Sequence, residues 1–154
     1  MGNACSSAGY TIKDGEATID ASKEDVVVSD KKLTSIAFRN LDNARIVRLW
    51  LDYNQLTSLP AEIGRLDWLQ MLGLRNNQLT SLPVEIGRLT GLTVLQLSNN
   101  PLTTPPMEVC EQGIAAIATY FRDLAAQGSV RSLSARLYMA GDSGNGKTCL
   151  ASVL

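Results

Sequence analysis

The chain has 154 residues, of which 45% are hydrophobic and 19% are charged, and its formal net charge of −1 lacks the basic excess that nucleic-acid binding requires. It contains no histidine, which excludes histidine-based acid–base catalysis and histidine metal sites. Its three cysteines, Cys5, Cys110 and Cys149, fit neither a disulfide framework nor a zinc pattern, and no apolar run is long enough for a membrane-spanning helix, so a reducing cytosol is the expected compartment.

The amino terminus carries a lipidation signal. Its first residues, Met-Gly-Asn-Ala-Cys-Ser, fit the myristoylation pattern M-G-x-x-x-[ST]. Removal of the methionine would expose the Gly2 amine for acylation, and Cys5 is placed to take a second chain, which stable anchoring needs because no basic cluster follows. The alternative is a tail of small residues without lipid. We expect residues 1–24 to be a flexible lipidation segment that holds a cytoplasmic protein at the inner face of a membrane if it is acylated.

The next residues predict a small hairpin and then an atypical repeat. Asp14-Gly15 lies between two β-prone runs, which is a two-residue hairpin signal. The apolar patterns of residues 26–28 and 33–36 recur 23 residues further on, but Lys31 stands where the later copies have asparagine. Terminal units of repeat arrays are expected to be atypical because one of their faces meets water. The array is therefore expected to begin at residue 25 and to extend to residue 106.

Three full units follow, near residues 46–68, 69–91 and 92–106, and each has the pattern L-x-x-L-x-L-x-x-N-x-L or an Ile variant of it. This pattern resembles the leucine-rich repeat, whose period is about 20–29 residues. Each L-x-L pair is expected on a short strand with both leucines inward, and stacked units would share one core. The inward amides of Asn54, Asn77 and Asn100 need backbone partners, so we expect them to form a hydrogen-bonded ladder. Three amphipathic helices are a poor alternative because Pro60 and Pro83 would break them.

The positions between the strand leucines predict the protein-binding surface. These side chains should point outward on the concave side of the repeat array. An exposed tryptophan beside arginine and tyrosine resembles the composition of a binding hot spot. The alternative is that Trp50 only packs against a neighbouring side chain or against the amino-terminal segment. The candidate residues for binding a protein partner are Arg48, Trp50, Asp52, Tyr53, Met71, Arg75 and Gln96.

A helix is predicted after the repeats. Residues 107–128 are expected to cap the open end of the repeat core, with a helix over residues 113–127 that carries Ile114, Ile117, Phe121 and Leu124 on one face. Gly128 is a plausible helix stop, and residues 129–132 have the composition of a linker. Cys110 is expected to be a small buried hydrophobe.

The last residues match the phosphate-binding P-loop, G-x-x-x-x-G-K-[ST]. A strand-like run over residues 135–140 precedes the motif, and a helix-like run follows it. Glycines let the backbone close around phosphates, Lys147 would reach the β- and γ-phosphates, and the Thr148 hydroxyl would bind Mg²⁺. The residues of this partial nucleotide site are Gly141, Asp142, Ser143, Gly144, Asn145, Gly146, Lys147 and Thr148. Residues 129–154 are therefore read as a linker and the start of a P-loop NTPase domain.

The order of these parts resembles the Roco proteins, in which leucine-rich repeats precede a Ras-like GTPase domain. The resemblance is strongest over residues 46–105 and 141–148. It implies GTP and Mg²⁺ as ligands of a complete parent protein. The motifs that select guanine in Ras-like domains do not occur within residues 1–154, so guanine specificity does not carry over to particular residues here. For this chain alone we expect no cofactor, no complete active site, and neither tight binding nor hydrolysis of GTP.

The sequence thus predicts an α/β protein: a short leucine-rich repeat solenoid with a carboxy-terminal capping helix and an incomplete P-loop strand–loop–helix. The expected function is protein–protein interaction in intracellular signalling, as the amino-terminal part of a membrane-anchored Roco-type GTP-binding protein. The alternatives are a stand-alone repeat scaffold with no nucleotide role and, third, an ATP-using regulator. The expected partners are a protein on the concave face and a membrane, and not a nucleic acid.

Overall fold

The computed structural model of the chain describes residues 9–140, with side chains as far as Gln127. Gly2, Cys5 and the predicted P-loop residues 141–148 lie outside the described residues. The chain divides into two compact units, Met1–Thr119 and Tyr120–Leu154, and the predicted repeats lie in the first. Between residues 9 and 140, no helix combines the length and the apolar character needed to cross a membrane.

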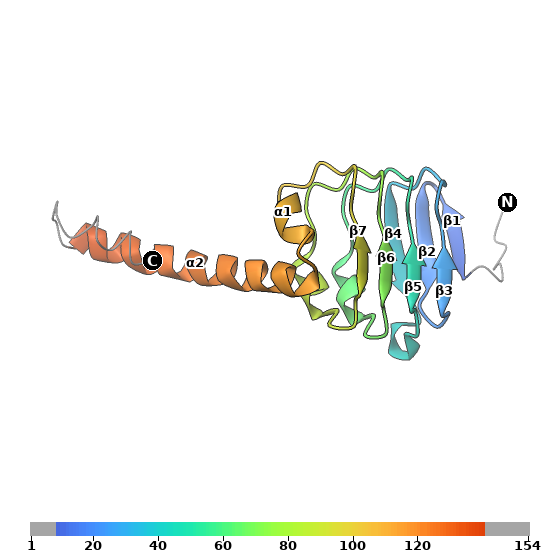
Figure 1. Ribbon diagram of the computed structural model, residues 1–154, viewed down its shortest axis with the longest axis horizontal. Coiled ribbons are helices and arrows are strands. Elements are labelled where there is room, and N and C mark those ends of the chain that lie inside the picture. Colours follow the sequence, from blue (N-terminus) through green and yellow to red (C-terminus); the bar gives the residue numbers. More distant parts are fainter. Residues whose placement is uncertain (1–8, 141–154) are drawn as a thin grey trace. The chain divides into compact units, whose positions relative to one another are not determined.

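One strand from each repeat joins a parallel sheet. Its strands, in order, are β3 (Asp25–Val27), β5 (Arg48–Trp50), β6 (Met71–Gly73) and β7 (Val94–Gln96), which lie side by side in Figure 1. Paired residues are 23 positions apart, as in Arg48 opposite Met71. Alternation along each strand turns the leucines inward, and Leu49 and Leu72 are fully buried. One strand from each of the three predicted units, and one from the atypical first unit, therefore pair in a single parallel sheet.

An asparagine ladder holds neighbouring coils together, as predicted. The Asn77 Nδ2 donates to the carbonyl oxygens of Leu51 and Leu74, both at 3.0 Å, and its Oδ1 accepts from the Leu56 N–H at 3.1 Å. Asn54 and Asn100 repeat this pattern one coil earlier and one coil later. Each amide thus bonds to its own coil and to the preceding one, which satisfies backbone groups that the turns leave without partners.

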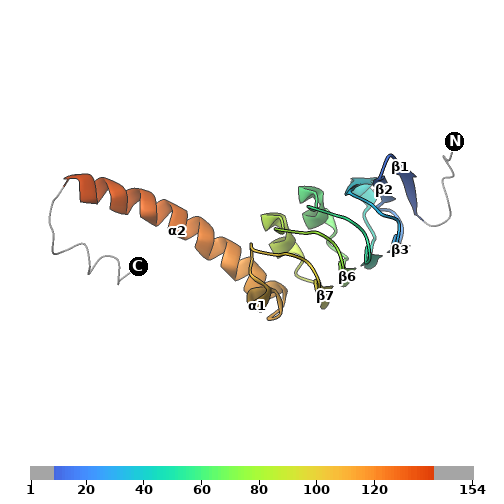
Figure 2. The same ribbon diagram turned by 90° about the horizontal axis from the view of Figure 1, so that it is seen from above.

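Short 3₁₀ helices form the return side of the second and third coils. The helices η2 (Ala61–Arg65) and η3 (Val84–Arg88) each begin directly after a proline, whose fixed φ suits the start of a helix. Figure 2 shows these turns on the side of the coils opposite the strands. Gly64 is buried, and an added Cβ there would come 2.7 Å from the Glu85 carbonyl oxygen. A glycine is therefore what lets η2 approach η3 so closely.

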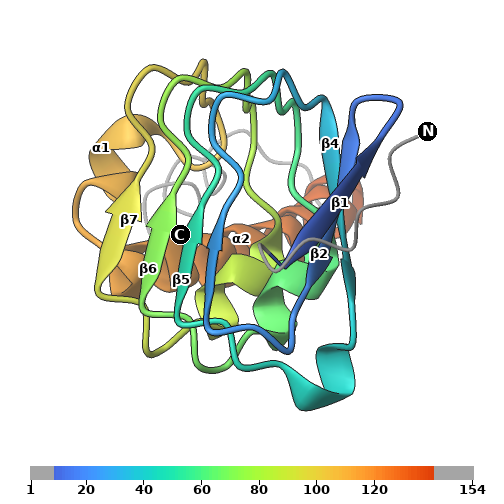
Figure 3. The same ribbon diagram turned by 90° about the vertical axis from the view of Figure 1, so that its right-hand side faces the viewer.

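A second sheet covers the amino-terminal end of the array. The strands β1 (Tyr10–Lys13) and β2 (Glu16–Asp20) form the predicted hairpin, whose turn residues Asp14 and Gly15 have φ values of 52° and 82°. β4 (Ser35–Arg39) pairs in parallel with β2 (Figure 3). β4 takes the place of a 3₁₀ helix in the first coil, where the residue aligned with Pro60 is Ala37, whose N–H can join a sheet.

The expectation of a flexible segment over residues 1–24 is wrong for its second half. Residues 10–20 form β1 and β2, and the Ala17 and Ile19 side chains are fully buried. The physical reason is the alternation of apolar and polar residues along β2, which gives the strand one face to bury. The sequence predicts the hairpin, but the prediction does not assign this face to the core.

A buried carboxylate ties the ends of β2 and β4 together. Asp20 is 9% exposed and accepts hydrogen bonds from Ser22 Oγ at 2.7 Å, from Asn40 Nδ2 at 3.0 Å and from Arg39 Nη2 at 3.4 Å. Asn40 has a left-handed φ of 58° and precedes the short 3₁₀ helix η1 (Leu41–Asn43). The side-chain bond from Asn40, followed by the bond from Ser22, lowers the pKa of Asp20 from 3.8 to about 2.

Two helices follow the last coil. Gly113, with a φ of 100°, separates α1 (Met107–Cys110) from α2 (Ile114–Ala140). Within the first unit, Ile117 is fully buried, and an added Cβ on Gly87 would come 3.1 Å from Ala118, so the start of α2 packs on the coil that contains η3. That this helix caps the whole core remains a prediction.

Four expectations about the end of this region differ from the structure. α2 continues past Gly128 to Ala140, where the sequence predicts a stop, a linker over residues 129–132 and a strand over residues 135–140. One glycine costs a helix only about 1 kcal/mol, and residues 129–140 contain no proline to end it. Leu124 was expected on the buried face of the helix, but it is 45% exposed.

Candidate functional site

The outward side of the parallel sheet carries the predicted protein-binding residues. We call this surface the sheet face and define it by Arg48, Trp50, Asp52, Tyr53, Met71, Arg75 and Gln96. The strand residues among these alternate with the inward leucines, so they share the side of the sheet that faces away from the core. Pairing in the sheet sets Arg48 opposite Met71 and sets Gln96 opposite Gly73. The structure therefore places the four strand residues, Arg48, Trp50, Met71 and Gln96, on one side of the sheet.

Arg48 is already paired. Its guanidinium donates through Nε and Nη2 to both carboxylate oxygens of Asp25 on the neighbouring strand β3. Each partner stabilises the charged form of the other, which raises the pKa of Arg48 and lowers the pKa of Asp25. Both side chains are about half exposed to solvent. The pair fixes the guanidinium plane at one edge of the sheet face.

Trp50 lies against the backbone of the next strand. An added Cβ on Gly73 would overlap the Trp50 ring and would come 2.7 Å from Asp52 Oδ2. Gly73 thus leaves the space into which the indole fits, and Trp50 is half-buried as a result. Asp52 accepts a hydrogen bond from the Arg75 N–H at 2.7 Å. Trp50 therefore packs on the backbone at Gly73, and part of its indole remains exposed.

Tyr53 differs from the residues that occupy the same place in the other coils. The positions 23 residues apart, Asp30, Tyr53, Asn76 and Asn99, all have a left-handed φ between 54° and 60°. Asn and Asp tolerate this conformation, whereas it is unusual for tyrosine. The Tyr53 side chain is 61% exposed. The chain thus displays an aromatic side chain at a position where its other coils have short polar residues.

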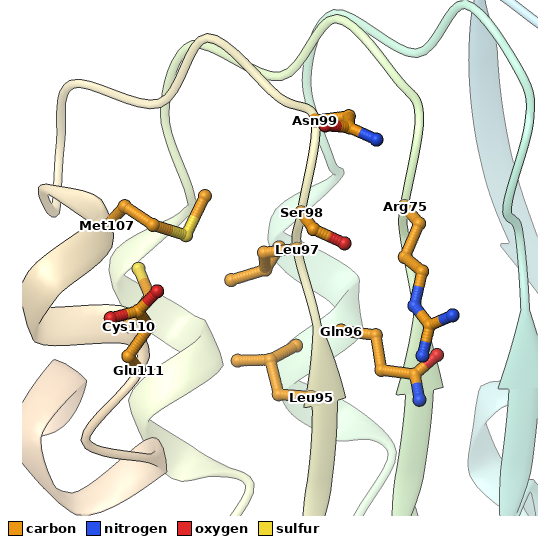
Figure 4. Close-up of a pocket in the computed structure, with 9 residues that line it drawn as sticks. All are labelled: Arg75, Leu95, Gln96, Leu97, Ser98, Asn99, Met107, Cys110 and Glu111. Atoms are coloured by element: carbon orange, nitrogen blue, oxygen red, sulfur yellow. The ribbon is translucent and has the colours of Figure 1, made fainter.

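A pocket lies beside β7, at the end of the sheet (Figure 4). Its volume is about 430 Å³, and Leu95, Leu97, Met107 and Cys110 supply its apolar walls. Leu95 and Leu97 point toward α1, whereas Gln96 and Ser98 point to the other side of the strand. The polar lining residues are Arg75, Gln96, Ser98, Asn99 and Glu111. Of these residues, the sequence singled out only Arg75 and Gln96 as binding candidates.

Cys110 behaves as the sequence predicts. Its side chain is buried, and burial raises the pKa of its thiol, with Glu108 and Glu111 adding to the rise. A raised pKa keeps the sulfur in the unreactive thiol form. An uncovered side at the last coil could have been anticipated, since residues 107–154 contain no further repeat to cover its inward leucines. In agreement, Leu95 is half-exposed, whereas Leu49 and Leu72 are fully buried.

Comparison with known proteins confirms the predicted repeats. Residues 44–102 match the family model described as leucine rich repeat. No curated protein sequence matches the chain. Among solved structures, 21 chains match. One of them is a leucine-rich repeat protein from Leptospira interrogans, with 30% sequence identity and a TM-score of 0.44, and the match covers 56% of this chain and 28% of that one. The family match ends before the predicted P-loop.

Proposed function

We propose that the leucine-rich repeats of this chain bind a protein partner through the sheet face, in an intracellular signalling protein. The observation that carries the proposal is the exposure of Tyr53 next to Trp50 on this surface. Tyrosine, tryptophan and arginine are the residues that most often dominate binding energy at protein interfaces. Trp50 and Arg48 are held in place by Gly73 and Asp25, so little side-chain freedom would be lost on binding.

A substitution that copies the other coils tests this proposal. Tyr53→Asn places the residue of Asn76 and Asn99 at the equivalent position, which removes the aromatic side chain without disturbing the left-handed turn. A photo-crosslinking amino acid at position 53 should trap the partner in cells. With the crosslinker at position 75 instead, Tyr53→Asn should capture at least tenfold less partner than the chain that keeps Tyr53.

The matched control uses Trp68, an aromatic side chain that is 65% exposed but lies in the connection before β6. A crosslinker at position 68 should not trap the same partner, and Trp68→Ala should leave its capture at position 75 unchanged. Equal crosslinking of one partner in Tyr53→Asn and in the unmodified chain would count against the sheet face.

We also propose a membrane anchor, with myristoyl on Gly2 and palmitoyl on Cys5, that holds the protein in the cytoplasm at the inner face of a membrane. The support is the sequence pattern of the first six residues. Mass spectrometry of the mature amino terminus should show one acyl group on Gly2 and a second on Cys5. Gly2→Ala should move the protein from the membrane fraction to the soluble fraction. If this variant remains on membranes, acylation of Gly2 is not the anchor.

For a complete parent protein we propose a GTP-binding module of Roco type that begins at the P-loop, with Lys147 and Thr148 as the phosphate and Mg²⁺ contacts. The support is the P-loop pattern of residues 141–148 and its place after the repeats. The helical residues 135–140 argue against it, since this motif follows a strand in nucleotide-binding domains. The competing proposal is a stand-alone scaffold. A coding sequence downstream that contains D-x-x-G and then N-K-x-D supports the GTPase, whereas a stop codon supported by complete transcripts favours the scaffold.

A further inference from the structure

The sheet of the repeats has an open edge at β7. Along the array, backbone N–H groups of one coil donate to carbonyl groups of the next in two regular series with N···O distances of 2.8–3.0 Å. In the first series, the N–H of Val28 donates to the carbonyl oxygen of Trp50, that of Leu51 to Gly73 and that of Leu74 to Gln96. In the second series, the N–H of Asp30 donates to Asp52, that of Tyr53 to Arg75 and that of Asn76 to Ser98. The next donors would be Leu97 and Asn99, and neither has a backbone acceptor among residues 9–140.

The open edge coincides with the pocket of Figure 4. Leu97 and Asn99 are both lining residues, and α1 supplies the opposite wall through Met107 and Cys110. The volume of about 430 Å³ lies within the range of known ligand sites, which is roughly 300–1,000 Å³. The site therefore offers two unpaired backbone donors, spaced as in a strand, beside an apolar recess.

We propose that this pocket binds an extended peptide segment of another protein, which pairs with β7 as an added strand and places one apolar side chain between Leu95, Leu97 and Met107. The donors at Leu97 and Asn99 call for acceptors two residues apart, which the carbonyl groups of an extended backbone provide. The apolar lining then selects the side chain at the position between them. The pocket shares Arg75 and Gln96 with the sheet face but does not include Trp50 or Tyr53, so Tyr53→Asn distinguishes this inference from the proposed role of the sheet face.

A second copy of this chain fits the edge less well than a peptide does. α1 stands opposite β7 across the pocket, which leaves a space for a single extended segment and not for another folded array. A two-fold pairing of β7 with its copy would also bring the α1 helix of each copy toward the other. The occupant is therefore expected to be a narrow, locally extended chain.

A library of random nonapeptides displayed on phage, selected on the full chain, tests the proposal. Selected peptides should bind with a dissociation constant that rises at least tenfold in Met107→Glu, because a carboxylate replaces part of the apolar wall. Val109→Glu is the matched control, since Val109 is also half-buried on α1 but does not line the pocket, and it should leave binding unchanged. Tyr53→Asn should also leave binding unchanged.

Hydrogen exchange identifies the site directly. Bound peptide should slow amide exchange at Leu97 and Asn99 at least tenfold, because their N–H groups would donate to carbonyl groups of the peptide. Three results would overturn the inference: selection that yields no peptide, peptides that protect only amides away from β7, or a dimer in sedimentation whose Leu97 and Asn99 amides are already protected without peptide. The last result would assign the edge to a second copy of the chain.

Discussion

At the residue scale, one carboxylate determines how the amino-terminal sheet responds to pH. Asp20 accepts four hydrogen bonds, from the Ser22 N–H and from the side chains of Ser22, Arg39 and Asn40. These bonds favour the ionised form, and they lower its pKa to about 2. Because the folded pKa lies below the ordinary value of 3.8, the stabilisation is fully present above pH 4 and is lost as the pH falls through 2.

Asp20→Asn should remove this pH-dependent stabilisation. We expect the free energy of unfolding at pH 7 to fall by about 1–2 kcal/mol, because the amide replaces a charged acceptor by a neutral one. The difference between the variant and the unmodified chain should shrink between pH 4 and pH 2 in urea titrations. Asp42→Asn is the control, since the Asp42 side chain is 94% exposed, and it should change stability by less than about 0.5 kcal/mol. A constant difference across this pH range would exclude the proposed ionisation.

Gly73 sets the position of Trp50, and a single methyl group tests this. Gly73→Ala should cost about 1–3 kcal/mol, because the added Cβ overlaps the indole ring, or should displace the ring from the sheet. The fluorescence of Trp50, recorded in a Trp68→Phe background, would report displacement as a red shift. Gly91→Ala is the matched control, since its nearest neighbours would lie 3.7 Å away. Unchanged stability and fluorescence in Gly73→Ala would mean that Trp50 does not rest on Gly73.

At the element scale, the asparagine ladder should matter most where it is buried. Asn77 is 6% exposed, whereas Asn100 in the last coil is half-buried. Asn77→Ala removes the acceptor of the Leu56 N–H and the donor to two carbonyl groups. The free energy of unfolding should fall by about 2–4 kcal/mol as a result. Asn100→Ala should cost about half as much, because water can reach the same groups. Chemical denaturation of both variants checks the order, and equal losses would contradict it.

The elements divide into those that local pattern determines and those that depend on neighbours. The L-x-L strands and the asparagine ladder were predictable, because burial of every second residue and the partners of a buried amide follow from the repeat itself. β4 was not predicted, because the sequence at its start follows the same apolar pattern as Leu56–Leu59. That pattern does not show that the chain forms a strand at Ala37, whereas it begins a 3₁₀ helix after the aligned Pro60. For α2, Gly128 was overestimated as a stop signal, since flanking helix formers outweigh one glycine.

The candidate site shows the same division. The sheet face was predictable, because alternation along the strands decides which residues point outward. The fit of Trp50 over Gly73 and the left-handed φ of Tyr53 depend on contacts between coils, which no single repeat contains. The pocket beside β7 required knowing that Met107 and Cys110 of α1 form its other wall, which the sequence of α1 does not specify.

At the scale of the whole repeat array, the two ends differ in how well they are covered. The amino-terminal end is covered by β1, β2 and β4, and Ile19 and Leu33 there are fully buried. At the other end, no strand among residues 9–140 pairs with the outer edge of β7, and Leu95 is only half-buried. In repeat arrays, each coil is stabilised by its neighbours, so a coil with one open side should open more often than an enclosed one. Local unfolding should therefore begin at β7.

Three chemically matched amides measure this asymmetry. The N–H groups of Leu33, Leu56 and Leu79 each donate to the ladder asparagine of the following coil at 3.1 Å. In native-state hydrogen exchange, Leu79 should exchange faster than Leu56, because its acceptor Asn100 lies in the coil with the open edge. Leu33 should exchange about as slowly as Leu56, although it lies in the first coil, because the amino-terminal sheet encloses it.

The amino-terminal sheet supplies the control for this comparison. Ile19→Ala removes a fully buried side chain from β2 and should cost about 2–4 kcal/mol, concentrated in the first coil. Exchange at Leu33 should then become faster than at Leu79, which reverses the order found in the unmodified chain. If Leu33 already exchanges faster than Leu79 in the unmodified chain, the amino-terminal sheet does not protect the array. The open edge at β7 would then not be its least stable end.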